Sequence, residues 1–195
     1  MIGGLVLAAG GGARFGTEPK LLADIDGRPV LQHAVETMTH VTDLDRVVVV
    51  LGADAELLLA RVPFGRAERV ICAGWREGQS ASLRYGVEAL GGAEKIVVTL
   101  GDQPMITPEM VERLIRAPAG SRATYHGKPG HPVVLGPQHV REIERLTGDE
   151  GARAILNGPL IETADLGVPR DLDTQKDLEE IRREVATSSG WSQEG

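Results

Sequence analysis

"VLAAGGGARFGTEPKLL", residues 6–22, joins an apolar segment to a loop with three consecutive glycines. The apolar segment begins at Gly4 and is continuous rather than alternating, which indicates a strand buried on both faces of a parallel sheet. Residues 46–52 and 95–101 form similar runs that end in glycine, and residues 68–72 form a weaker fourth run. The sequence therefore predicts an α/β fold built on a mostly parallel sheet.

Helix-like segments separate these runs, and each is long enough to cross over a sheet. A strand–helix–strand series of this kind predicts a doubly wound sheet with right-handed crossovers. The segment at 106–117 carries start signals, with Thr107 as a capping residue and Pro108 at the first helical position. The earlier helical segments are residues 29–40, 54–62 and 79–90.

The second half of the chain is less regular. Residues 122–127 and 131–136 flank "KPG" and predict a pair of antiparallel strands. Asp173 or Thr174 is placed to cap a final helix. We expect a single-domain, Rossmann-like three-layer sandwich over residues 1–187, with an antiparallel addition to the sheet and a flexible tail at 188–195. The remaining predicted elements are helices at 137–148 and 149–158, a strand at 160–166 and the final helix at 173–186.

The composition narrows the class of protein. The chain has 195 residues, 42% hydrophobic and 25% charged, with a net charge of −7. Cys72 is the only cysteine, which excludes an internal disulfide framework. No apolar run approaches the roughly 20 residues of a membrane helix, and no basic segment precedes an apolar leader. We therefore expect a cytoplasmic protein with no membrane partner and no nucleic-acid partner, since the latter requires a basic face.

The glycine loop narrowly misses two phosphate-binding patterns. Thr17 stands where a Walker loop has lysine, and Phe15 stands where a dinucleotide fingerprint has its third glycine. A tight turn without a ligand is the alternative interpretation. Glycines, however, let backbone N–H groups converge on an anion, and Arg14 and Lys20 add two cations within seven residues. Such a loop suits several phosphates in a row, as in a triphosphate.

Residues 7–16, "LAAGGGARFG", followed by Lys20, resemble the LAAGxSxRMGxxK signature of the MobA-like nucleotidyltransferases. Within that superfamily the chain is most similar to the MocA branch, the molybdenum cofactor cytidylyltransferases. The signature differs at Gly12, where serine is common, and at Phe15, where methionine is common. Five further segments resemble motifs of the branch in the same order, namely residues 74–86, 100–104, 129–134, 148–153 and 171–178.

The resemblance implies attack of an acceptor phosphate on the α-phosphorus of a nucleoside triphosphate, with release of pyrophosphate and with Mg²⁺ held by carboxylates. Asp102 directly follows an apolar strand, so it lies at the carboxyl edge of the sheet, where open α/β sheets bind ligands. We expect Asp102 and Asp173 to be the metal ligands. The alternatives are a turn role for Asp102 and a plain cap for Asp173, and Asp171 is the less favoured second ligand.

The resemblance also assigns the nucleotide site. Arg14, Lys20 and Asp102 are expected to carry catalysis. Ser80 or Ser82 is expected to contact the base, although helical serines often simply face solvent. LAAG accompanies cytidine transfer and LAGG guanosine transfer in the resembling families, so Ala9 favours CTP over GTP. The expected nucleotide-binding residues are Leu7, Ala8, Ala9, Gly10, Gly11, Gly12, Arg14, Lys20, Ser80, Ser82 and Asp102.

For the acceptor, the resemblance implies a molybdopterin-type phosphate and a molybdoenzyme as a possible receiving partner. His131, Asp149 and Arg153 are the expected acceptor-binding residues. His131 is alternatively structural, and Asp149 with Arg153 alternatively forms a local ion pair on one short helix. Three other functions are open: transfer to a sugar or polyol phosphate, a nucleotide-dependent oxidoreductase, and a non-catalytic cofactor carrier that would need no metal pair.

Overall fold

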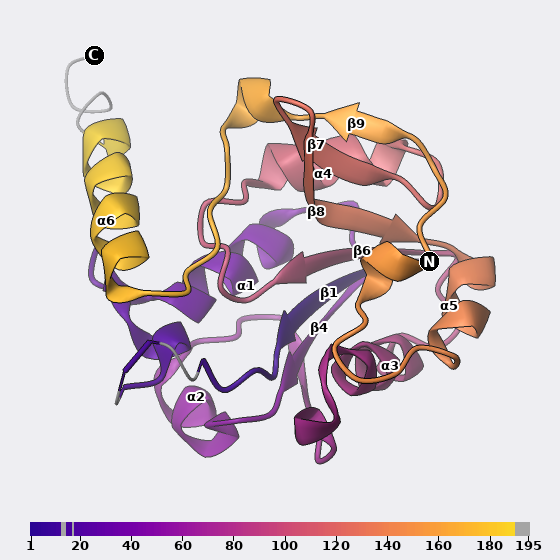
Figure 1. Ribbon diagram of the computed structural model, residues 1–195, viewed down its shortest axis with the longest axis horizontal. Helices are drawn as coiled ribbons and strands as arrows, with labels where there is room; N and C mark the ends of the chain where they lie inside the picture. The colour runs from indigo at the N-terminus through magenta and orange to yellow at the C-terminus, as the bar shows by residue number, and fades with distance from the viewer. Residues whose placement is uncertain (13–14, 17, 190–195) are drawn as a thin grey trace.

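The computed structural model describes residues 1–12, 15–16 and 18–189. Seven strands form one twisted sheet in the order β5-β4-β1-β6-β8-β7-β9, and a two-stranded hairpin of β2 and β3 lies apart from it (Figure 1). The strands are β1 (Ile2–Ala8), β2 (Asp24–Ile25), β3 (Arg28–Pro29), β4 (Arg46–Leu51), β5 (Glu68–Ile71), β6 (Lys95–Leu100), β7 (Arg122–Tyr125), β8 (Lys128–Leu135) and β9 (Leu160–Glu162).

β1 is the axis of the sheet. It pairs in parallel with both β4 and β6, and Leu5 lies opposite Val48 on one side and Val98 on the other. All three side chains are fully buried, as the continuous apolar runs predict. β8 runs antiparallel to β6 and β7, so the predicted antiparallel addition to a mostly parallel sheet is confirmed.

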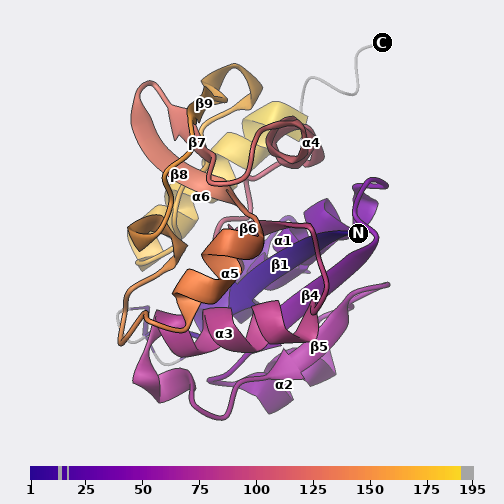
Figure 2. The ribbon, with the colours of Figure 1, turned by 90° about the vertical axis from the view of Figure 1, so that its right-hand side faces the viewer.

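Helices cover both faces of the sheet and complete the predicted three-layer sandwich. α3 and α5 lie on one face, and α1 and α4 lie on the other (Figure 2). The buried apolar residues accordingly form two clusters, one containing Leu83 of α3 and the other containing Met38 of α1. The helices are α1 (Val30–His40), α2 (Ala55–Arg61), α3 (Gln79–Ala89), α4 (Pro108–Arg116), α5 (Pro137–Ile143) and α6 (Gln175–Ser189).

The β7–β8 hairpin turns earlier than predicted. Its turn is made by His126 and Gly127, with φ of 52° and 77°, so residues 128–130 belong to β8 and do not connect the strands. The carboxylate of Glu162 accepts hydrogen bonds from the His126 and Ala164 amides, at 3.0 and 3.2 Å, and thereby ties this turn to β9. The antiparallel pair was predicted correctly, and the position of its turn was wrong.

The segments after β8 are shorter than the sequence predicts. The expected helix at 137–148 ends at Ile143, because the amides of Arg145 and Leu146 bond to carbonyls three residues back and tighten the chain. The expected helix at 149–158 is reduced to a 3₁₀ turn at Ala152–Ala154. The strand expected at 160–166 ends at Glu162 and is followed by a second 3₁₀ turn.

The final helix, α6, runs to Ser189, so Ser188 and Ser189 of the expected tail are helical and residues 190–195 lie outside the described residues. Of the two candidate caps, Thr174 accepts a hydrogen bond from the Asp177 amide at 3.2 Å. No helix within the described part of the chain combines the length and hydropathy needed to cross a bilayer.

We expect Gly86→Ala to destabilise the fold, because a Cβ at Gly86 would collide with the Leu5 side chain and lie 2.9 Å from Val50 Cγ2. α3 therefore packs with its backbone directly on β1 and β4. Overpacking should lower the free energy of unfolding by about 1–3 kcal/mol, despite the better helix propensity of alanine. Urea denaturation measures this. Exposed Glu88→Ala in the same helix is the control, expected within about 0.5 kcal/mol of the wild type. An unchanged or higher stability of Gly86→Ala would contradict the close packing.

Candidate active site

A cavity of about 650 Å³ opens at the carboxyl ends of β1 and β6, the edge at which open α/β sheets bind ligands. The structure brings ten of the predicted site residues to its wall. Gly11 lies next to Trp75, since a Cβ at Gly11 would be 3.6 Å from the Trp75 ring. The cavity is lined by Leu7, Ala8, Ala9, Gly10, Gly11, Gly12, Lys20, Leu21, Trp75, Arg76, Gly78, Gln79, Ser82, Leu100, Asp102 and Asp149.

Lys20, on the cavity wall, forms ion pairs with two aspartates. Its ammonium group donates a hydrogen bond to Asp102 Oδ2 at 2.6 Å and lies 3.6 Å from Asp173 Oδ1. The Lys20 and Asp102 side chains are 12% and 18% exposed, and that of Asp173 is 45% exposed. Burial raises the pKa of Asp102, and the charge and hydrogen bond of Lys20 partly oppose that rise. One cation thus supports two carboxylates from distant parts of the sequence.

Three segments converge at these ion pairs. The glycine loop contacts α6, because Gln175 Nε2 donates to the Phe15 carbonyl at 3.1 Å. The segment before α6 contacts the end of β6, because the Leu172 amide donates to the Asp102 carbonyl at 3.0 Å. Gln103 Nε2 also donates to the Asp171 carboxylate. Asp173 is therefore held next to Asp102 by backbone and side-chain bonds on both sides of it.

Gly12 gives Lys20 its space. Its φ is 53°, which favours glycine, and a Cβ there would lie 2.9 Å from Lys20 Cγ and 3.0 Å from Lys20 Cδ. The Phe15 amide donates to the Gly12 carbonyl at 2.9 Å and closes the turn. The departure from the more common serine at this position thus has a structural reason, because in this chain the Lys20 stem occupies that space.

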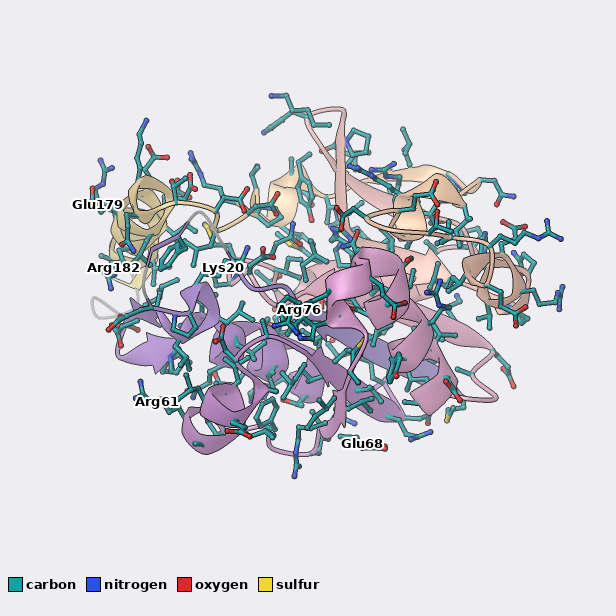
Figure 3. The ribbon with its side chains drawn as sticks, turned by 60° about the horizontal axis from the view of Figure 1, so that its bottom comes forward. Lys20, Arg61, Glu68, Arg76, Glu179 and Arg182 are labelled. Atoms are coloured by element: carbon teal, nitrogen blue, oxygen red, sulfur yellow. The ribbon has the colours of Figure 1, made fainter. Side chains whose placement is uncertain are left out.

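Trp75 and Arg76 also line the cavity, and the sequence analysis missed both as site residues. The Arg76 guanidinium lies 4.4 Å from the centre of the Trp75 ring, within cation–π range. Figure 3 shows Lys20 and Arg76 near the middle of the molecule, whereas Arg61 and Glu68 lie at its edge. The two wall residues belong to a 3₁₀ turn, Trp75–Glu77, which is too short to leave a periodic signal in the sequence. The one available signal was the segment at 74–86, of which only the serines were used.

The two candidate serines differ in position. Ser82 lines the cavity, whereas Ser80 is fully buried outside the lining, and its hydroxyl has no hydrogen-bond partner among the described residues. Arg14, the other expected phosphate-binding cation, lies outside the described residues.

The expected acceptor residues separate into two places. Asp149 lines the cavity, whereas His131 of β8 and Arg153 do not. Asp149 precedes the 3₁₀ turn at Ala152–Ala154 and Arg153 lies within it, so the short helix expected to carry both is absent from the described chain. Burial lowers the pKa of His131 to about 4, with the nearby Asp171 carboxylate opposing the change. The His131 ring is therefore neutral at pH 7.

Asp102 and Asp173 have the donor chemistry for a divalent cation. Their carboxylate oxygens are the hard ligands that Mg²⁺ prefers, and Mg²⁺ keeps several waters, so two protein ligands suffice. The described residues contain no group of three or more His, Cys, Asp or Glu side chains arranged for a metal ion. The pair therefore fits an ion that is bound jointly by protein and phosphate oxygens, and does not fit a metal enclosed by protein ligands alone.

We expect Gly12→Ala to raise the pKa of Asp102 further. The new methyl group would displace the Lys20 stem, and Lys20 is the main influence that lowers this pKa. Carbon-detected NMR titration of the aspartate carboxyl groups measures the change. Gly10→Ala is the matched control, since a Cβ there meets no atom within 4 Å, and it should leave the titration of Asp102 unchanged. Equal Asp102 pKa values in both variants would show that Gly12 does not position Lys20.

Comparison with known proteins agrees with this geometry. The chain is 32% identical over 191 residues to nicotine blue oxidoreductase of Paenarthrobacter nicotinovorans, covering 90% of this chain and 93% of the relative. Its fold matches the crystal structure of the Mycobacterium tuberculosis Rv0371c homologue from Mycobacterium sp. strain JC1, with a TM-score of 0.84, 30% identity and coverage of 95% and 97% of the two chains. It also matches the manganese complex of Rv0371c from Mycobacterium tuberculosis H37Rv, with a TM-score of 0.75, 26% identity and coverage of 93% and 98%. The MobA-like NTP transferase domain matches residues 4–165, and the chain belongs to that family.

Proposed function

We propose that this protein transfers a nucleoside monophosphate, CMP rather than GMP, from a nucleoside triphosphate to a phosphorylated acceptor. An acceptor phosphate oxygen forms a bond to the α-phosphorus, the bond from that phosphorus to the α,β-bridging oxygen breaks, and pyrophosphate leaves. The observation that supports this most is the Lys20 ammonium, held between Asp102 and Asp173 on the wall of a glycine-lined cavity.

The chain supplies alignment and charge. The nucleophile is already an anion, so the reaction needs no general base. Gly10–Gly12 offer backbone N–H groups to the phosphates, and Lys20 stabilises negative charge at the reacting phosphate. Arg14 is proposed to bind the β- and γ-phosphates. Asp102 and Asp173 are proposed to hold Mg²⁺, which would neutralise charge on the triphosphate as pyrophosphate leaves.

A divalent cation gains support from the related Mycobacterium tuberculosis structure, which is a complex with manganese. For the base, Ser82 is preferred over Ser80 because Ser82 lines the cavity. Ala9 lies on the same wall and is 4% exposed, so it is placed to limit the size of the base. The acceptor is proposed to be a molybdopterin-type phosphate bound beside His131, Asp149 and Arg153, within a cytoplasmic enzyme whose product passes to a molybdoenzyme.

The substrate pair is tested by incubating the protein with Mg²⁺, the molybdopterin cofactor and each nucleoside triphosphate in turn, and measuring released pyrophosphate. CTP should give the fastest release, because Ala9 leaves room suited to the smaller base. Release must depend on the acceptor. Equal rates with CTP and GTP would remove the argument from Ala9, and acceptor-independent release would indicate hydrolysis.

We expect Asp102→Asn to lower the rate of pyrophosphate release by at least about 100-fold, since it removes a negatively charged ligand of the proposed Mg²⁺ ion. The neutral isostere leaves the Lys20 ammonium with only Asp173, 3.6 Å away, as its counter-charge, so the melting temperature should fall. Asp43→Asn, at an exposed position on the connection before β4, is the matched control and should turn over like the wild type. Normal turnover of Asp102→Asn would rule out the metal assignment.

A nucleotide-dependent oxidoreductase is the second candidate, favoured by one observation: the relative at 32% identity is named nicotine blue oxidoreductase. The same cavity would then hold a dinucleotide whose phosphates contact the glycine loop. The two functions separate in one assay, because hydride transfer consumes NADH or NADPH absorbance and releases no pyrophosphate. Asp102→Asn distinguishes them as well, since hydride transfer needs no carboxylate pair for a metal.

A further inference from the structure

Two arginines, Arg122 and Arg153, lie on one face of the outer half of the sheet. Arg122 begins β7 opposite Val133 of β8, and the Val133 side chain packs in the same buried cluster as Ala152. Arg153 follows Ala152 in the 3₁₀ turn that packs against β8. Arg122 and Arg153 therefore lie on the same face of the sheet. Neither residue lines the cavity that contains Lys20.

Arg122 lacks a counter-charge within the described chain. Its Nε is buried and has no hydrogen-bond partner among the described residues. Its pKa is lowered, first by burial and then by the charge of Arg153. Other arginines of the described chain do have carboxylate partners, for example Arg46 with Glu68 and Arg113 with Asp165. A buried Nε–H without a hydrogen-bond partner is unfavourable, and an anion bound at the guanidinium would satisfy it.

The pair lies near the reacting centre. His131 experiences the charges of Arg122, Arg153 and Asp171, and Asp171 also acts on Asp102. The Tyr125 hydroxyl donates to the His131 carbonyl at 2.6 Å and thereby holds the middle of β8. Arg122 lies opposite Val133 of β8, and Val133 lies opposite Val98 of β6, so Arg122 is two strands away from the strand that leads to Asp102. A ligand bound by the arginines can extend toward the nucleotide without entering the nucleotide's own cavity.

We propose that Arg122, together with Arg153, binds a phosphate group of the second substrate. The inference rests on the proposed transfer for the identity of that substrate, and the anion site itself rests only on the arginines. The planar guanidinium fork matches the oxygens of a phosphate, and Arg122 is held rigidly at the start of a strand. The neutral ring of His131 adds a hydrogen bond to the same ligand without a further positive charge. Arg122 is thereby a substrate-binding residue that the sequence did not reveal.

The anion site is tested first without any chemistry. Under the proposed function inorganic phosphate would also bind at the glycine loop, so Lys20→Met serves as the background that weakens that site. Calorimetry then compares phosphate binding by Lys20→Met, by Lys20→Met with Arg122→Met, and by Lys20→Met with Arg61→Met. Arg61 lies on exposed α2, away from Lys20 in Figure 3, and controls for loss of one charge.

Phosphate should bind to Lys20→Met, and adding Arg122→Met should weaken that binding by roughly tenfold or more, whereas adding Arg61→Met should not. No binding to Lys20→Met, or equal binding by all three proteins, overturns the proposal. Arg122→Met should keep or raise the melting temperature, because it removes a buried Nε–H that has no hydrogen-bond partner among the described residues. Arg153→Met changes an exposed side chain, so it provides the same comparison if Arg122→Met does not fold.

The second arm measures transfer. Arg122→Met should raise the KM for the phosphorylated acceptor by roughly tenfold or more, and should change the Kd for CTP less than twofold. A rise in the Kd for CTP with an unchanged acceptor KM would place Arg122 at the nucleotide and overturn the assignment. If the wild type transfers no nucleotide to any acceptor, the proposed function fails while the phosphate-binding result still decides the anion site.

Discussion

The Lys20 ammonium group between Asp102 and Asp173 is the interaction on which the site depends. It joins three regions of the chain: the loop after β1, the end of β6 and the segment before α6. Lys20 and Asp102 are 82 residues apart in the sequence, and Asp102 and Asp173 are 71 residues apart. The Asp102 side chain is largely buried, and the Lys20 ammonium group 2.6 Å away stabilises its negative charge. Removing either partner would leave an uncompensated charge at the wall of the cavity.

The sheet places this interaction. β1 lies between β4 and β6, so the glycine loop and Asp102 emerge from the same edge. The antiparallel β8 then brings His131 back beside that edge, and β7 adds Arg122 one strand further out. The parallel half thus supplies the glycine loop and Asp102, and the antiparallel half supplies His131 and Arg122.

Much of the parallel half was readable from the sequence, because strands buried on both faces leave continuous apolar runs and crossover helices leave long segments between them. Asp102 was predictable for the same reason, as the first charged residue after such a run. Trp75, Arg76 and Arg122 were not. Trp75 and Arg76 lie in a 3₁₀ turn with no periodicity, and an arginine that begins a short strand gives no sign in the sequence of whether its charge is buried or paired. The choice between Ser80 and Ser82 depended on which face of α3 meets the cavity, a packing property of the folded chain.

We propose that a metal-bound triphosphate binds at Lys20, Asp102 and Asp173. Anomalous diffraction from crystals grown with Mn²⁺ and a non-hydrolysable CTP analogue tests this binding mode. We expect a manganese peak in contact with the carboxylates of Asp102 and Asp173, with the triphosphate along Gly10–Gly12 and Lys20 Nζ bonded to a phosphate oxygen. A manganese peak away from both carboxylates, or a nucleotide bound outside the glycine loop, would contradict it.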